Sequence, residues 1–117
     1  MALLYQACVV LSVVLFFYYG TACLVADGMV AEFERFGLSG FRRLTGALEL
    51  LGAIGLVVGY RVPVVTLVSA GGLTLLMVLG TVTRIRFRDS VAETMPAAIL
   101  GLMNLYILLY ALGVLRP

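Results

Sequence analysis

The sequence has no histidine, no lysine and no tryptophan, and its eight basic residues are all arginine. Without histidine, the commonest general base and one of the main zinc ligands is missing. Charged residues make up only 12% of the 117 residues, against about a quarter in soluble domains. The net charge of +2 is too small and too scattered to hold a nucleic-acid backbone. A soluble enzyme, a disordered protein and a nucleic-acid binder are therefore poor interpretations.

Cysteine is also scarce, because Cys8 and Cys23 are the only two. On one helix they would lie roughly 22 Å apart, too far for a disulfide between them. The chain has no CxxC motif, so thiol-relay chemistry and haem or metal ligation have little to build on. We interpret both cysteines as packing residues and expect neither a bound metal nor a catalytic residue.

Hydrophobic residues, by contrast, make up 63% of the chain, more than a water-surrounded core of this size can bury. A helix needs about 20 apolar residues to cross the hydrocarbon of a bilayer. Four stretches are close to that length, and Glu49 is the one charged residue within them: 2–26, 44–60, 62–83 and 95–115. The sequence predicts an all-α integral membrane protein, a single domain built as a four-helix bundle.

The arginines predict how the chain is oriented. The loop between the first two spans holds Arg35, Arg42 and Arg43, and the loop between the last two holds Arg84, Arg86 and Arg88. The opposite side of the membrane has only Arg61 and Arg116. By the positive-inside rule, both longer loops face the cytoplasm and both termini face outward. The first stretch lacks the basic start of a signal peptide, so we expect a retained helix; cleavage near Ala26 is the alternative.

Local patterns indicate where the helices begin. Apolar residues at helical spacing from Met29 to Phe36 predict a short helix lying in the membrane interface between the first two spans. Pro63 suits the first turn of the third span. The fourth span has two candidate starts, one at Thr94–Pro96 and one at the capping box Ser90–Glu93.

Small and polar residues mark the faces on which membrane helices pack. In the second span these are Gly46, Gly52, Gly55 and Gly59, and the last two form a GxxxG pair. Asn104 in the fourth span is expected to bond between helices.

Glu49 is the residue that most needs an explanation, because a lone carboxylate within a span costs several kcal/mol. One interpretation is a site for a proton or a substrate. The other is structural: the carboxylate accepts bonds from Thr or Tyr hydroxyls, or pairs with Arg42 or Arg84. We group Glu49, Arg42, Arg84, Thr45 and Asn104 as a predicted polar core that is either binding or structural.

The segments Phe36–Ser39, Arg42–Glu49 and Leu51–Ala53 resemble the DoxX-like family of small bacterial membrane proteins. The NACHO chaperone of nicotinic receptors is distantly similar and shares the Gly46–Glu49 string. The resemblance implies a four-helix bundle with the Glu49 carboxylate inside, and no single activity. Members are associated with quinone-linked oxidoreductase subunits, redox-stress complexes and receptor assembly. The chain has Cys23 where many relatives have Lys, and Arg84 where many have His, which weakens a redox role.

Three functions stay open. The first is a non-catalytic partner or assembly subunit that binds another membrane protein, or a second copy of itself, within the bilayer. The second is a binder or carrier of a small lipophilic molecule, such as a quinone or a lipid, near Glu49. The third is a small proton-coupled transporter, for which the six-to-two bias of the arginines is unfavourable. A quinone-linked activity would need redox centres supplied by partner chains.

Overall fold

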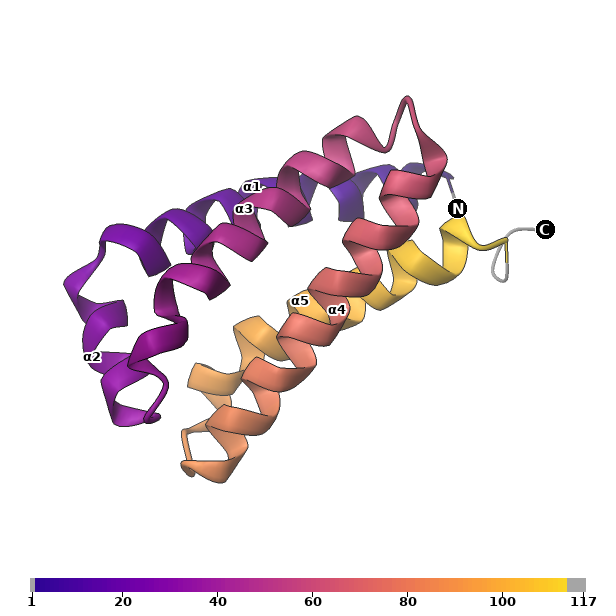
Figure 1. Cartoon of the computed structure of the whole chain (residues 1–117). Coiled ribbons are helices and arrows are strands. Elements are labelled where there is room, and N and C mark those ends of the chain that lie inside the picture. The colour runs from indigo at the N-terminus through magenta and orange to yellow at the C-terminus, as the bar shows by residue number, and fades with distance from the viewer. Residues whose placement is uncertain (1, 114–117) are drawn as a thin grey trace.

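The computed structural model describes residues 2–113, which fold into helices and short connections. The elements are α1 (Ala2–Val25), α2 (Asp27–Arg35), the short 3-10 helix η1 (Ser39–Phe41), α3 (Arg42–Val58), α4 (Pro63–Arg86) and α5 (Val91–Ala111) (Figure 1). The all-α prediction is confirmed, and so is a short helix between the first two long ones. Residues 114 and 115 of the predicted fourth span, and Arg116, lie outside the described residues.

Two helix starts show how local chemistry sets the boundaries. Pro63 opens α4 in its first turn, as predicted, where no helical hydrogen bond needs its missing N–H. Of the two candidate starts for the last helix, the Ser90–Glu93 capping box is the one that forms, and α5 begins at Val91. Ser90 Oγ accepts from the Glu93 N–H at 3.2 Å, and the Glu93 carboxylate accepts from the Ser90 N–H at 3.4 Å. Pro96 then lies within the second turn of α5.

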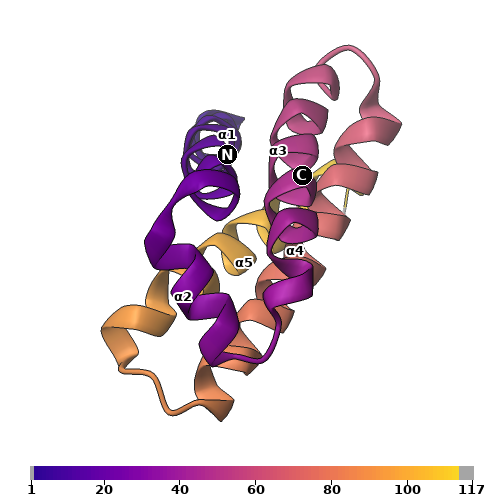
Figure 2. The same cartoon turned by 60° about the vertical axis from the view of Figure 1, so that its left-hand side comes forward.

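The four long helices are arranged as a ring of neighbours. Helix α1 packs against α3 and α5, and α4 packs against the same two helices. Among the described residues the diagonal pairs, α1 with α4 and α3 with α5, do not meet. Figure 1 shows the α3–α4 turn at the same end as the start of α1. Helix α2 and the α4–α5 connection lie at the other end, which we call the loop end (Figures 1 and 2).

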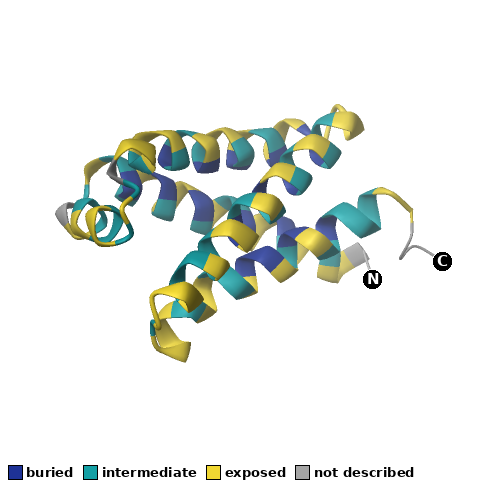
Figure 3. Cartoon of the chain, turned by 60° about the horizontal axis from the view of Figure 1, so that its bottom comes forward, coloured by how far each residue is buried: buried dark blue, intermediate teal, exposed yellow. Residues whose placement is uncertain are grey.

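The outer surface of this ring is apolar. Exposed large hydrophobic residues occur on all four long helices, for example Val14, Leu51, Val68 and Leu102 (Figure 3). Helices α1, α4 and α5 are long and apolar enough to cross a membrane, whereas α3 has 17 residues. Such a surface requires an apolar surround, because a soluble monomer rarely exposes large contiguous apolar areas.

The core is formed where the four helices face one another. Its fully buried hydrophobic side chains include Phe16 of α1, Leu56 of α3, Leu73 of α4 and Ile107 of α5. Four polar residues are buried with them: Ser12, Glu49, Thr66 and Asn104. Polar groups in such an environment are stable only when bonded, so their partners decide what each of them does.

Candidate functional site

A close helix crossing places Glu49. A Cβ atom on Gly46 would lie 2.9 Å from the Gly20 carbonyl oxygen, and one on Gly20 would lie 3.0 Å from the Gly46 carbonyl oxygen. The α1 and α3 backbones therefore touch at these two glycines, as small residues allow in membrane helices. Glu49 comes one helical turn after Gly46 and lies on the buried face of α3.

The Glu49 side chain is buried, and no bond to it is found among the described residues. The residue is only 5% exposed, and its buried Oε2 has no hydrogen-bond partner among the described residues. No hydroxyl and no arginine in the described part of the chain donates to it, so the structural interpretation made from the sequence is wrong in its proposed partners. An unbonded buried acceptor costs about 1–3 kcal/mol, and more when it is charged.

Arg42, one of the two expected partners, instead ties α1 to α3. Its guanidinium donates to the carbonyl oxygens of Cys23 at 2.5 Å and Leu24 at 3.0 Å. These carbonyls belong to the last turn of α1, whose acceptors have no helical donor. Arg42 therefore caps α1, and its hydrogen-bonding capacity is directed away from Glu49.

Arg84, the other expected partner, belongs to a group at the loop end that we call the charge cluster: Glu32, Arg35, Arg84 and Asp89. Arg84 Nη1 donates to Asp89 Oδ2 at 2.8 Å and to Glu32 Oε2 at 3.3 Å. Arg35 Nη2 lies 2.9 Å from Asp89 Oδ1 and 3.0 Å from Glu32 Oε2. Each carboxylate is thus held by both guanidinium groups.

Aromatic rings and electrostatics consolidate the charge cluster. The Arg35 guanidinium lies 4.5 Å from the centre of the Phe36 ring, which packs edge to face on Phe87 at 5.1 Å. Hydrogen bonds from Arg35, and then from Arg84, hold the pKa of the Asp89 carboxyl below its ordinary value. The bond to Asp89 likewise raises the pKa of Arg35. Both shifts favour the charged forms of Asp89 and Arg35.

Asn104 and Thr45, the remaining residues of the predicted polar core, belong neither to the Arg42 cap nor to the charge cluster. Asn104 Nδ2 donates to Ser12 Oγ at 3.3 Å and to the Leu100 carbonyl at 2.9 Å, so it bonds between helices as expected. Its Oδ1 is buried without a partner among the described residues. Thr45 is half-buried in the turn before Glu49. The predicted polar core therefore separates into the Arg42 cap, the charge cluster and an interior that contains Glu49 and Asn104.

The other glycines of α3 meet α4. Gly55 faces Ser69, Gly59 faces Thr66, and Leu73 fills the notch that Gly52 leaves. A side chain at Gly55 or Gly59 would collide with these residues, so the GxxxG pair lies at a close contact between α3 and α4.

Sequence reasoning missed most of the charge cluster and the Gly20–Gly46 crossing. The three-residue spacing of Glu32 and Arg35 was a legible signal for one ion pair. No local signal pointed to Asp89, because 54 positions separate it from Arg35.

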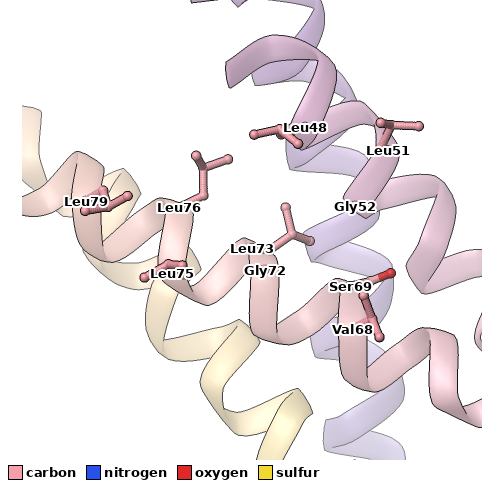
Figure 4. A pocket seen from close by; sticks show the side chains of 10 residues that line it. All are labelled: Leu48, Leu51, Gly52, Val68, Ser69, Gly72, Leu73, Leu75, Leu76 and Leu79. Atoms are coloured by element: carbon pink, nitrogen blue, oxygen red, sulfur yellow. The ribbon is translucent and has the colours of Figure 1, made fainter. Parts of the chain in front are cut away.

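Two cavities open on the outside of the ring. The larger, about 430 Å³, lies between α3 and α4, and Figure 4 shows its leucines around Gly52 and Gly72. The smaller, about 280 Å³, lies between α1 and α5, and Tyr19 and Pro96 are among its lining residues. Glu49 lines neither of them.

The comparison with known families shows to which family the chain belongs. The DoxX-like family matches residues 7–106, which is most of the chain. This chain belongs to the DoxX-like family. The match includes Gly20, Gly46 and Glu49, and together with the apolar helices it identifies a multi-pass membrane protein. No curated protein and no solved structure matches the chain.

Proposed function

We propose that this DoxX-like protein binds a small lipophilic molecule that donates a hydrogen bond to Glu49. The observation that carries the proposal is the buried Oε2 atom, which no described residue satisfies. Asn104 Oδ1 is a second buried acceptor in the same state. Because these two buried oxygens can accept hydrogen bonds, they favour a ligand that has a hydroxyl or N–H group over a ligand that can only accept hydrogen bonds.

The chemistry of this contact gives an expected size for the effect. A hydrogen bond to a charged group contributes about 1.5–3 kcal/mol, which corresponds to roughly a 10- to 150-fold change in affinity. The rest of the ligand is expected to be apolar, because the buried residues of the core are mostly hydrophobic. A quinol, the reduced form of a quinone, is one molecule of this class, and a lipid with a free hydroxyl is another.

The proposal includes all four long helices crossing the bilayer as a bundle. The 17 residues of α3 extend about 26 Å at 1.5 Å per residue, close to the hydrocarbon thickness. Arg42 and Arg61 flank this segment and can reach the headgroups at each end. In this arrangement the loop end, which holds most of the arginines, faces the cytoplasm of a bacterial cell.

Ligand retention tests the proposal. The protein is purified in mild detergent, and the lipophilic molecules bound to it are extracted and measured by mass spectrometry. We expect a molecule that co-purifies with the wild type to fall at least about tenfold in Glu49→Gln. Glu93→Gln is the matched control, because glutamine also serves in a capping box at that position. An equal bound amount in both variants contradicts the proposal.

A second function, binding to another membrane protein, is favoured by the cavity between α3 and α4. It faces outward and is lined by leucines, and a Cβ on Gly72 would meet nothing within 4 Å. Small residues left uncovered on a membrane helix are where a partner helix can approach closely. The occupant we propose is one transmembrane helix of a different protein.

Gly72→Leu tests this second function, because it fills the cavity without a collision inside the fold. We expect it to abolish co-purification of a membrane partner that the wild type retains. Val78→Leu is the control, since Val78 is exposed on α4 but does not line the cavity. Loss of the partner in both variants, or in neither, contradicts it.

A further inference from the structure

Helix α2 is joined to the two halves of the molecule in different ways. It packs at backbone distance against α1, α3 and η1. Among the described residues it has no such packing against α4 or α5. The charge cluster, with the ring contact between Phe36 and Phe87, is what bridges α2 to the end of α4 and its connection to α5 (Figure 2).

The bridge lies between two helix pairs. Arg35 and Glu32 come from α2, which continues from α1, whereas Arg84 lies in the last turn of α4 and Asp89 follows that helix. Close contacts between α3 and α4 are found from Gly52 to Gly59, toward the turn that joins them. Tyr60 also donates to Gln6 at 2.6 Å at that end. At the loop end, the charge cluster links α2 to Arg84 of α4 and to Asp89 in the connection that follows α4.

The bridge is made of side chains that water and ions can reach. The side chains of Arg35, Glu32 and Arg84 are 39%, 30% and 22% exposed. Ion pairs of this exposure contribute little net energy and are screened by salt. The ion pairs and the Phe36–Phe87 ring contact therefore link α2 to α4, and such side-chain contacts can break without unfolding a helix.

We propose that α2 is a releasable strap, which holds the loop ends of the two helix pairs together and limits access from that end to the interior around Glu49. Control of a ligand by the strap rests on the proposed function, whereas the existence of the strap rests only on the contacts of the charge cluster. Asp89 is the anchor, because it is bonded to arginines of both α2 and α4 and its side chain is only 4% exposed.

Spin-label distances test the strap directly. Nitroxides are attached at Glu34→Cys on α2 and Val91→Cys at the start of α5, in full-length protein that also carries Cys8→Ala and Cys23→Ala. Both sites are exposed, and neither takes part in the charge cluster. We expect a narrow distance distribution in the otherwise unchanged chain. In Asp89→Asn we expect a broad distribution that is shifted to longer distances.

Arg88→Gln is the matched control, because it removes an adjacent exposed charge that makes no ion pair in the described structure. It should leave the distribution narrow. If Asp89→Asn does not fold, the unchanged chain is titrated with sodium chloride, which should broaden the distribution by screening. A distribution that stays narrow in Asp89→Asn, or in high salt, overturns the strap. Equal broadening in Arg88→Gln also overturns it.

Access to the interior has a separate reporter that needs no ligand. Cys23 is 1% exposed, and its Cβ lies 3.0 Å from the position of a Cβ on Gly46, one turn before Glu49. In Cys8→Ala protein, labelling of Cys23 by N-ethylmaleimide should become several-fold faster with Asp89→Asn and stay unchanged with Arg88→Gln. Unchanged labelling despite a broadened distribution contradicts control of access. The spin-label distances and the Cys23 labelling rates do not depend on the Glu49→Gln retention test. The proposed function can therefore be wrong while the strap is correct, and the reverse.

Discussion

Two carboxylates of this protein have little exposed side-chain surface and have opposite surroundings. Glu49 is 5% exposed in the bundle interior, and the Asp89 side chain is 4% exposed at the loop end. Asp89 is bonded to two guanidinium groups, whereas the buried Oε2 of Glu49 has no partner among the described residues. Burial alone therefore does not say what a membrane carboxylate does.

The difference follows from what each position can reach. Asp89 lies between two helices, where long arginine side chains from α2 and α4 converge. Glu49 receives no hydrogen bond from Arg42 or Arg84, because α1 carbonyls engage Arg42 and the charge cluster engages Arg84. A bonded carboxylate contributes to the fold, and an unbonded one weakens it and stays available to a ligand. The predictions below test this contrast in order of expected size.

The largest effect is expected where the fold places Glu49. Gly46→Leu puts a side chain where the α1 backbone lies 2.9 Å away, so the helices must separate. Overpacking typically lowers the free energy of unfolding by about 1–3 kcal/mol. We expect a loss at the upper end of this range, because the new side chain would meet backbone atoms, which cannot move aside easily. We expect little folded protein by size-exclusion chromatography. Gly72→Leu, which has open space, should fold normally; equal yields of the two variants contradict the crossing.

Loss of the paired carboxylate should come next. Asp89→Asn leaves Arg35 and Arg84 facing each other with one acid in place of two. We expect the melting temperature, followed by circular dichroism, to fall by about 5 °C. Glu34→Gln removes an exposed α2 charge outside the cluster and should change it by less than about 2 °C. An equal fall in both variants means that general charge, and not pairing, is responsible.

The same pairing predicts a pH dependence. The pKa of Asp89 in the folded protein lies below its ordinary value of about 3.9. Its stabilisation is therefore complete above that value and is lost as the pH falls through the lowered folded-state pKa. The difference in melting temperature between wild type and Asp89→Asn should be constant from about pH 7 to 5 and shrink below about pH 4. A difference that disappears by pH 5 contradicts the lowered pKa.

The sequence predicted what depends on hydropathy and local chemistry. The long helices follow from the apolar stretches, and the Ser90–Glu93 box and Pro63 follow from short-range bonding. It could not predict which charges meet, because Arg35 and Asp89 are brought together by the packing of whole helices. For the same reason Arg84 was only one of several candidate partners for Glu49, whereas the structure pairs it with Asp89, five positions away.

The smallest effect on the position of α2 is expected from a change beside the charge cluster. Ser90→Ala removes the cap of α5 and should cost about 1 kcal/mol. Because Ser90 makes no bond to Arg35 or Arg84, the spin-label distribution between α2 and α5 should stay narrow. Thermal unfolding and the distance measurement together check this. A broad distribution in Ser90→Ala would show that any weakening near residue 89 releases α2.

The central claim is that Glu49 is buried without a structural partner, and the stability of Glu49→Leu tests it most directly. Replacing an unpaired buried carboxylate by an apolar side chain of similar size removes a penalty and leaves no partner exposed. We predict that Glu49→Leu melts at or above the wild-type temperature in lipid nanodiscs. A fall as large as that of Asp89→Asn would contradict the claim and show that Glu49 stabilises the fold.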